Sequence, residues 1–264
     1  MYKVLLLLLP ILLFSKFQVT TTFPFEAQII KRIAKNNVRI KTISNTFLNN
    51  ILKFTSSEIE NLSQTKVYFN FSLEVEKKYE KIFLKKNPNL NIVSMSRNIK
   101  KLKYNGKDNP YIWLDPILLR DVAKNIYETF IKIDSFNKQE YLKNYEEFLS
   151  ELDNSFLDTL KKLQDSEVYN IFVFDETFDY FAKRFKINIF NIEDRILYAE
   201  EIKGLMSFVK KNNIKAIFIQ KQRNIVAAKS LAGYTNISIK SYDIYDELIS
   251  FDLSKITDNF QNTK

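Results

Sequence analysis

Residues 137–164 read NKQEYLKNYEEFLSELDNSFLDTLKKLQ, with no Gly or Pro to interrupt a helix. Their bulky side chains recur every three or four positions, which places them on one face of an α-helix. They are Tyr141, Tyr145, Phe148, Leu149, Leu152, Phe156, Leu160 and Leu163. We expect Asn137 to cap the helix, with Glu140 completing a capping box. At a rise of about 1.5 Å per residue the helix would be roughly 42 Å long, enough to connect two lobes. A long helix packed on a single core is the alternative.

Strands and helices alternate on both sides of this helix, which predicts mostly parallel sheets with helices on their faces. The predicted strands cover residues 17–23, 38–43, 67–71, 91–95, 168–174, 187–192, 214–220 and 236–242. The predicted helices cover residues 24–35, 47–63, 73–85, 116–131, 176–185, 199–213 and 224–234. The fold class is therefore α/β, with two lobes of four strands each. We expect an N-terminal lobe over 16–136, a linking helix over 137–164 and a C-terminal lobe over 165–264.

The composition excludes several classes of protein. The chain of 264 residues has no Cys and no His, which rules out disulfides, thiol chemistry, Ser-His-Asp catalysis and imidazole metal ligands. No pair of nucleophile and base and no phosphate-binding Gly loop is visible, so we expect no enzyme. The net charge of +9 is spread among acidic residues, which indicates a basic surface and no nucleic-acid groove.

Residues 1–15, MYKVLLLLLPILLFS, predict a secretory signal peptide. The apolar run is shorter than the roughly 20 residues that a membrane-spanning helix needs. We expect an exported protein, periplasmic or associated with the cell surface, and no lipid anchor because there is no Cys. The sequence leaves open whether the segment is cleaved after Ser15 or stays as an anchor.

The stretch 96–109, SRNIKKLKYNGKDN, carries five basic residues and has no apolar period. We interpret it as a charged surface loop in contact with solvent. A loop that binds an anion or a partner is the alternative.

Two aspartates follow directly on predicted strands of the second half. In open parallel sheets, ligands bind beyond the carboxyl ends of the strands, which is where Asp175 and Asp243 fall. The two carboxylates are therefore candidates for one cleft. Each also precedes a predicted helix, so an N-cap is the alternative for either residue.

Several motifs, taken in order, resemble the zinc- and manganese-type substrate-binding proteins of bacterial ABC importers. The most specific are Trp113-Leu114-Asp115-Pro116 and Val173-Phe174-Asp175, the latter followed by Phe178-Asp179-Tyr180-Phe181. The others are VTTTFPFEAQIIKRIA (19–34), FTSSEIENL (54–62) and KAIFIQKQRNIVAAKSLA (215–232). The resemblance covers nearly all of the chain after residue 16. It implies two α/β lobes joined by one rigid helix.

The resemblance also implies a site for one divalent cation between the lobes. By position, the family's metal ligands fall on Asn50, Tyr111, Asp175 and Asp243 of this chain. The family's histidines are thus replaced, and the remaining groups are oxygen donors. Because oxygen ligands suit Mn, Mg or Ca better than Zn, we expect a hard cation if the site binds a metal.

The function implied is that of a monomeric, extracytoplasmic solute-binding protein that delivers a divalent metal ion to an ABC permease in the membrane. Two alternatives stay open. One is an exported family member that has lost metal binding and acts in cell adhesion or another interaction. The other is a protein that binds an organic or chelated ligand, with Tyr111 and Trp113 lining an enlarged cleft.

Overall fold

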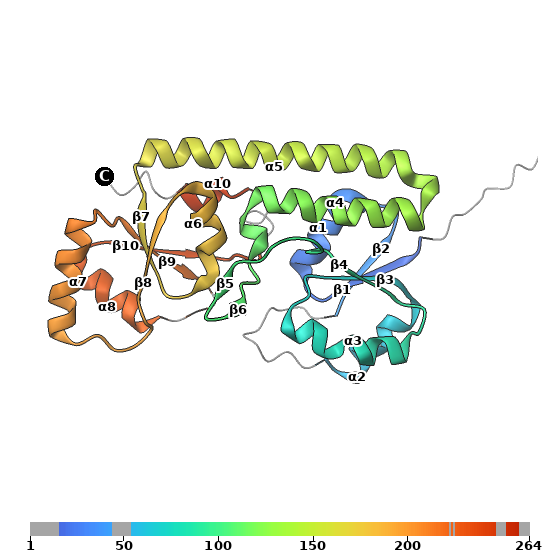
Figure 1. Ribbon diagram of the computed structural model, residues 1–264, viewed down its shortest axis with the longest axis horizontal. Coiled ribbons are helices and arrows are strands. Elements are labelled where there is room, and N and C mark those ends of the chain that lie inside the picture. The colour runs from blue at the N-terminus through green and yellow to red at the C-terminus, as the bar shows by residue number, and fades with distance from the viewer. Residues whose placement is uncertain (1–15, 44–53, 222, 224, 247–251, 259–264) are drawn as a thin grey trace, which may run out of the picture.

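The structure is a computed structural model that describes residues 16–43, 54–221, 223, 225–246 and 252–258. Two α/β lobes lie side by side, and one long helix, α5 (Lys138–Ser166), runs across both of them (Figure 1). This confirms the predicted fold class.

Each lobe contains one parallel four-stranded sheet. The N-terminal sheet has the order β2-β1-β3-β4 and the C-terminal sheet the order β10-β9-β7-β8. If the strands are numbered in chain order within each lobe, the first sheet has the order 2-1-3-4 and the second has the order 4-3-1-2. Read from its other edge, the second order is also 2-1-3-4. The two lobes therefore share one topology. The strands are β1 (Gln18–Thr21), β2 (Arg39–Thr42), β3 (Thr65–Asn70), β4 (Asn91–Ser94), β7 (Asn170–Val173), β8 (Asn188–Asn191), β9 (Ala216–Gln220) and β10 (Ser238–Tyr242).

Helices connect the strands and cover the sheets. They are α1 (Pro24–Ala34), α2 (Ser56–Glu60), α3 (Glu74–Lys86), α4 (Pro116–Ile133), α6 (Asp179–Phe185), α7 (Ala199–Lys211), α8 (Val226–Thr235) and α10 (Ser254–Thr257). Short 3₁₀ turns are η1 (Asn61–Gln64), η2 (Ile112–Leu114), η3 (Ser135–Asn137) and η4 (Glu176–Phe178). The helix predicted over 47–63 is observed only as α2 and η1, and residues 44–53 lie outside the described part of the chain. No helix in the described ranges has the length and apolar character that a membrane crossing requires.

The start of α5 differs from the prediction. Asn137 makes no capping hydrogen bond with its side chain, because it belongs to the turn η3 and its backbone (φ −91°, ψ 15°) is not extended as a capping residue requires. Its Nδ2 instead donates to Asp134 Oδ2 at 2.8 Å, and the Tyr141 hydroxyl donates to the same oxygen at 2.6 Å. The junction of α4 and α5 is therefore organised by Asp134.

The two lobes are packed directly against each other. The buried Trp113 indole lies 4.5 Å from the Phe25 ring and 6.0 Å from the Tyr245 ring, measured between centroids. Its Nε1 donates to the Ile244 carbonyl at 3.0 Å. One apolar cluster thus runs from the N-terminal lobe through Trp113 into the C-terminal lobe, although the sheets are separate.

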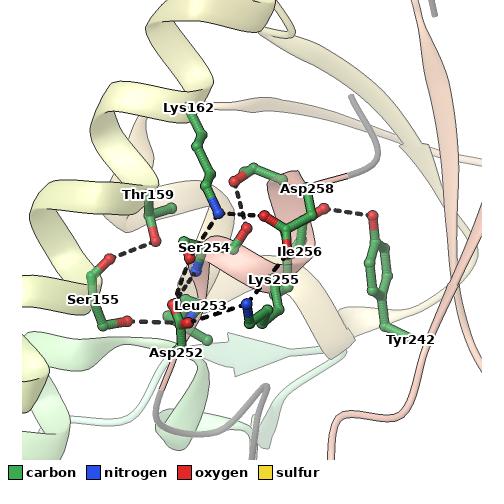
Figure 2. A network of polar contacts seen from close by, with 11 residues as sticks. Ser155, Thr159, Lys162, Tyr242, Asp252, Leu253, Ser254, Lys255, Ile256 and Asp258 are labelled. Atoms are coloured by element: carbon green, nitrogen blue, oxygen red, sulfur yellow. Dashed lines mark hydrogen bonds and ion pairs between the residues drawn. The ribbon is translucent and has the colours of Figure 1, made fainter. Parts of the chain in front are cut away.

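The C-terminal segment is fastened to α5 (Figure 2). Leu253 N–H donates to Ser155 Oγ at 2.9 Å, and Lys162 Nζ, which forms an ion pair with Asp258, also contacts Ser254 Oγ at 3.1 Å. The end of the described chain therefore returns from the second sheet to the long helix.

Candidate functional site

A cavity of about 1000 Å³ lies between the lobes. Four strands deliver residues to its wall at their carboxyl ends: Phe23 after β1, Leu73 after β3, Asp175 after β7 and Gln220 at the end of β9. In each sheet these strands are the neighbouring pair at which the strand order reverses, β1 with β3 and β7 with β9. Such switch points are where open α/β sheets bind ligands. The fold therefore brings two of these binding positions face to face.

A β-hairpin forms a further wall of the cavity. It consists of β5 (Lys103–Tyr104) and β6 (Lys107–Asp108), joined by a turn in which Gly106 has φ 78°. Tyr180 ties this stretch to the C-terminal lobe, since its hydroxyl accepts from Leu102 N–H at 2.9 Å and donates to the Asn109 carbonyl at 3.2 Å. The stretch 96–109 is largely exposed at the surface, as predicted, but it also forms a hairpin that is anchored to the C-terminal lobe and lines the cavity.

Asp175 faces the cavity but has both carboxylate oxygens engaged. Its Oδ1 accepts from Thr177 N–H at 2.9 Å and thereby caps η4, while Oδ2 forms an ion pair with Arg223. The side chain is 13% exposed. Asp175 therefore both caps a helical turn and lies in the cleft. The guanidinium of Arg223 already neutralises its charge.

Tyr111 also lines the cavity, with its hydroxyl bonded to neighbours. The hydroxyl accepts from Gln220 Nε2 at 3.1 Å and shares a hydrogen bond with Tyr245. Burial raises the pKa of Tyr111 and that of Tyr245, so both are neutral phenols at physiological pH. Neutral phenols are poor cation ligands, and Tyr111 acts here as a wall of the cavity.

Of the other two predicted ligands, one lies away from the described cavity lining and the other lies outside the described residues. Asp243 is absent from that lining, and its Oδ1 accepts from Tyr245 N–H at 3.2 Å in the turn after β10. Asn50 lies outside the described residues. Across the described ranges, no three His, Cys, Asp or Glu side chains come together to form a group that could hold a metal ion. The oxygen donors of the described residues therefore do not fit a bare cation. That Asp243 and Asn50 bind a metal stays a prediction.

Asp179, at the start of α6, lies close to the cavity residues Asp175 and Glu176 but does not line the cavity itself. Burial, together with the nearby charges of Glu176 and Asp175, raises its pKa to about 6, although a hydrogen bond from Asn109 Nδ2 at 3.1 Å opposes the shift. Asn109 Nδ2 also donates to the Glu176 carbonyl at 2.7 Å. These bonds fix the hairpin against η4.

Sequence reasoning missed three residues of the site: Lys101, Gln220 and Arg223. Gln220 ends a predicted strand, so the rule applied to the aspartates could have found it. Arg223 lies three positions later. It was missed because only ligands for cations were considered, and a guanidinium is itself a cation. For Lys101 the only signal was its place in a basic stretch.

Comparison with known proteins gives the family. Residues 19–256 match the protein family described as "Zinc-uptake complex component A periplasmic", and the chain belongs to this family. It is 30% identical over 133 residues to the high-affinity zinc uptake system protein ZnuA of Bacillus subtilis (strain 168), which covers 47% of this chain and 40% of that protein. It is 24% identical over 243 residues to the metal ABC transporter substrate-binding lipoprotein SloC of Streptococcus mutans, covering 85% of this chain and 79% of that protein.

Solved structures show the same fold. A crystal structure of ZnuA superimposes with a TM-score of 0.82 at 20% identity, over 94% of this chain and 99% of that one. A periplasmic metal binding protein from Candidatus Liberibacter asiaticus, in a Cd-bound structure, gives a TM-score of 0.77 at 20% identity, covering 93% of this chain and 100% of that chain.

The match to several curated relatives is partial: it spans 40% of the B. subtilis protein and 56% of the manganese ABC transporter substrate-binding lipoprotein PsaA of Streptococcus anginosus. The resemblance noted in the sequence is confirmed. The family consists of transport components, and the chain is not an enzyme.

Proposed function

We propose that this chain is the extracytoplasmic solute-binding component of an ABC importer, which holds a metal cargo in the cavity between its lobes and delivers it to a membrane permease. The observation that carries this proposal is the position of the cavity at the switch points of both sheets. Family membership over 19–256 supports a metal as the cargo.

The side chains present support a metal that prefers oxygen ligands as the cargo. The chain has no His and no Cys, which are the ligands that zinc prefers. Oxygen donors favour a harder metal such as Mn. Asp175 is the one predicted ligand with a carboxylate in the described cavity wall, while Asp243 and Asn50 remain proposed ligands. We further propose that the protein is exported and acts as a monomer.

Elemental analysis of the full chain, purified without chelators, tests this proposal. Val75 lines the cavity, so Val75→Trp should narrow it and lower metal retention without changing any charge. Val226→Trp is the matched control, because Val226 is 53% exposed at the start of α8. We expect stoichiometric metal in the wild type and in Val226→Trp. A metal-free wild type, or a metal content that Val75→Trp leaves unchanged, would contradict the proposal.

A further inference from the structure

The charges around the cavity do not form a site for a bare cation. Three pairs cancel within the wall: Lys77 Nζ lies 3.8 Å from Glu74 Oε1, and ion pairs join Lys103 to Asp108 and Arg223 to Asp175. The charged residues left over from the lining are Lys101, Lys107 and Glu176. The wall thus carries a small surplus of positive charge, which repels a dication and attracts an anion.

Lys101 supplies a donor that has no carboxylate partner. Its Nζ donates to the Phe71 carbonyl at 2.8 Å, and within the described ranges no carboxylate oxygen lies within 4.0 Å of it. The Lys101 side chain is partly buried, and this burial lowers the pKa of its ammonium group. An ammonium has three N–H donors, and the bond to Phe71 uses one of them.

Arg223 stands where a cation would have to contact Asp175. Its guanidinium engages Asp175 Oδ2, while the other carboxylate oxygen is used by Thr177 N–H. A metal ion bound to Asp175 would lie beside this guanidinium, with which it shares the sign of its charge, and the two would repel each other. The remaining N–H groups of Arg223 suit the oxygens of a carboxylate, which the guanidinium can bind with two parallel bonds.

The size of the cavity agrees with these charges. Sites for small organic molecules have volumes of roughly 300–1,000 Å³, whereas a single water takes up about 30 Å³ of liquid. At about 1000 Å³, the cavity is much larger than one ion requires.

We propose that the cavity takes its metal as an anionic chelate, in which an organic polycarboxylate supplies the metal's oxygen ligands and keeps a surplus negative charge. Lys101 and Arg223 bind carboxylate oxygens of the chelate, and Tyr104 and Tyr111 form walls around it. This inference rests on the proposed function, because it assumes that the cavity holds the cargo. It explains how a family member without histidine can carry a metal: the chelator provides the ligands that the protein lacks.

Isothermal titration calorimetry on the full chain tests the inference with probes of opposite charge. The anionic probes are iron(III) citrate and the exchange-inert cobalt(III)-EDTA complex, and the cationic probes are MnCl₂, ZnCl₂ and hexaamminecobalt(III). We expect an anionic chelate to bind and the cationic probes not to bind. Lys101→Gln and Arg223→Gln should each weaken chelate binding at least tenfold, whereas Lys101→Arg should retain it. Lys203→Gln, an exposed position on α7 outside the cavity lining, controls for loss of charge alone.

The outcomes separate the two proposals, provided that the melting temperatures of the variants stay near that of the wild type. If free Mn or Zn binds with an affinity that Lys101→Gln and Arg223→Gln leave unchanged, the chelate inference is overturned and the solute-binding function stands. If neither free ions nor anionic chelates bind at millimolar concentration, both proposals are overturned. If the chelates bind but the Lys203→Gln variant is weakened as much as the Lys101→Gln variant, the assignment of the binding residues is wrong.

Discussion

Two glutamates without solvent exposure, Glu26 and Glu76, bond to the backbone of the cavity residues Phe23 and Leu73. Each is the third residue of its helix and accepts two backbone N–H groups with Oε2: Glu26 from Thr22 and Phe23 at 2.8 and 2.9 Å, and Glu76 from Leu73 and Phe71 at 2.8 and 3.1 Å. Among the described residues, Glu26 Oε1 has no N–H or O–H donor, and its neighbour is the Glu76 carboxyl. Two carboxyl groups can bond to each other only through a proton, so the pair retains one.

The shared proton makes the stability of the N-terminal lobe depend on pH. Burial and the charge of Glu76 raise the pKa of Glu26 well above its ordinary value of 4.5. A raised folded pKa means that the pair's contribution to the free energy of unfolding is complete below pH 4.5 and is lost as pH rises through the folded pKa. In Glu26→Gln an amide N–H replaces the proton, so we expect the decline of unfolding free energy above about pH 5 to be flatter than in the wild type. Urea titrations from about pH 5 to about pH 9 measure this.

The control for this prediction is Glu58→Gln. Glu58 is also the third residue of a helix and completes a capping box with Thr55, but it is partly exposed. The wild-type slope with pH should persist in this variant. An identical slope in wild type and Glu26→Gln would show that no proton is shared.

Asp115 ties two helices together. Its Oδ1 caps α4 by accepting from Ile117 N–H at 2.9 Å and Leu118 N–H at 3.3 Å, and it also accepts from Arg184 Nε on α6 at 2.7 Å. Asp115→Ala removes the cap and leaves Arg184 unpaired, so we expect a loss of about 1–3 kcal/mol of unfolding free energy. Asp115→Asn keeps an acceptor oxygen and should lose less. Equal losses in the two variants in a urea titration would contradict this assignment.

At the scale of elements, the sequence predicted the strands well because each is a short apolar run between helices with clear starts. The Pro after Asp115 and the cap itself, for example, marked the start of α4 correctly. The order of the strands in the sheet was not predictable from these patterns, and the site depends on it. Asp175 follows β7 at the switch point, whereas Asp243 follows β10 at the sheet's edge, separated from β7 by β9. Both residues follow the carboxyl end of a strand, where ligands bind in open sheets. Only the order of the strands in the sheet distinguishes the two positions.

The hairpin β5–β6 was missed for a similar reason. Its strands have two residues each, too short for a periodic pattern, and its position is set by Tyr180 from the C-terminal lobe. Such long-range contacts leave no local signal in the stretch 96–109.

The C-terminal helix α10 is expected to stabilise the linking helix mainly through apolar packing. Ile256 is fully buried, whereas the side chains of the ion pair between Lys162 and Asp258 are 31% and 38% exposed. We therefore expect Ile256→Ala to lower the unfolding free energy by about 2–5 kcal/mol and Lys162→Gln by less than about 1 kcal/mol. Chemical denaturation of both variants tests this ranking. A larger loss in Lys162→Gln would show that the polar network shown in Figure 2 dominates.

At the scale of the whole molecule, an uninterrupted α5 and the contacts of Trp113 across the lobes limit hinge motion. The chain has no Cys, so spin labels can be placed specifically at Lys85→Cys on α3 and Lys211→Cys on α7. Pulsed electron resonance should give one narrow distance distribution that changes little when iron(III) citrate is added. Two well-separated distances, or a large shift on addition, would show that the lobes open as hinged bodies.

The most direct test of the account is anomalous diffraction from crystals of the full chain, purified without chelators. We expect a metal peak in the cavity between the lobes, with density of an organic ligand connecting it to Lys101 and Arg223. A metal peak outside the cavity, or a cavity that contains only water in a chain with bound metal, would contradict it.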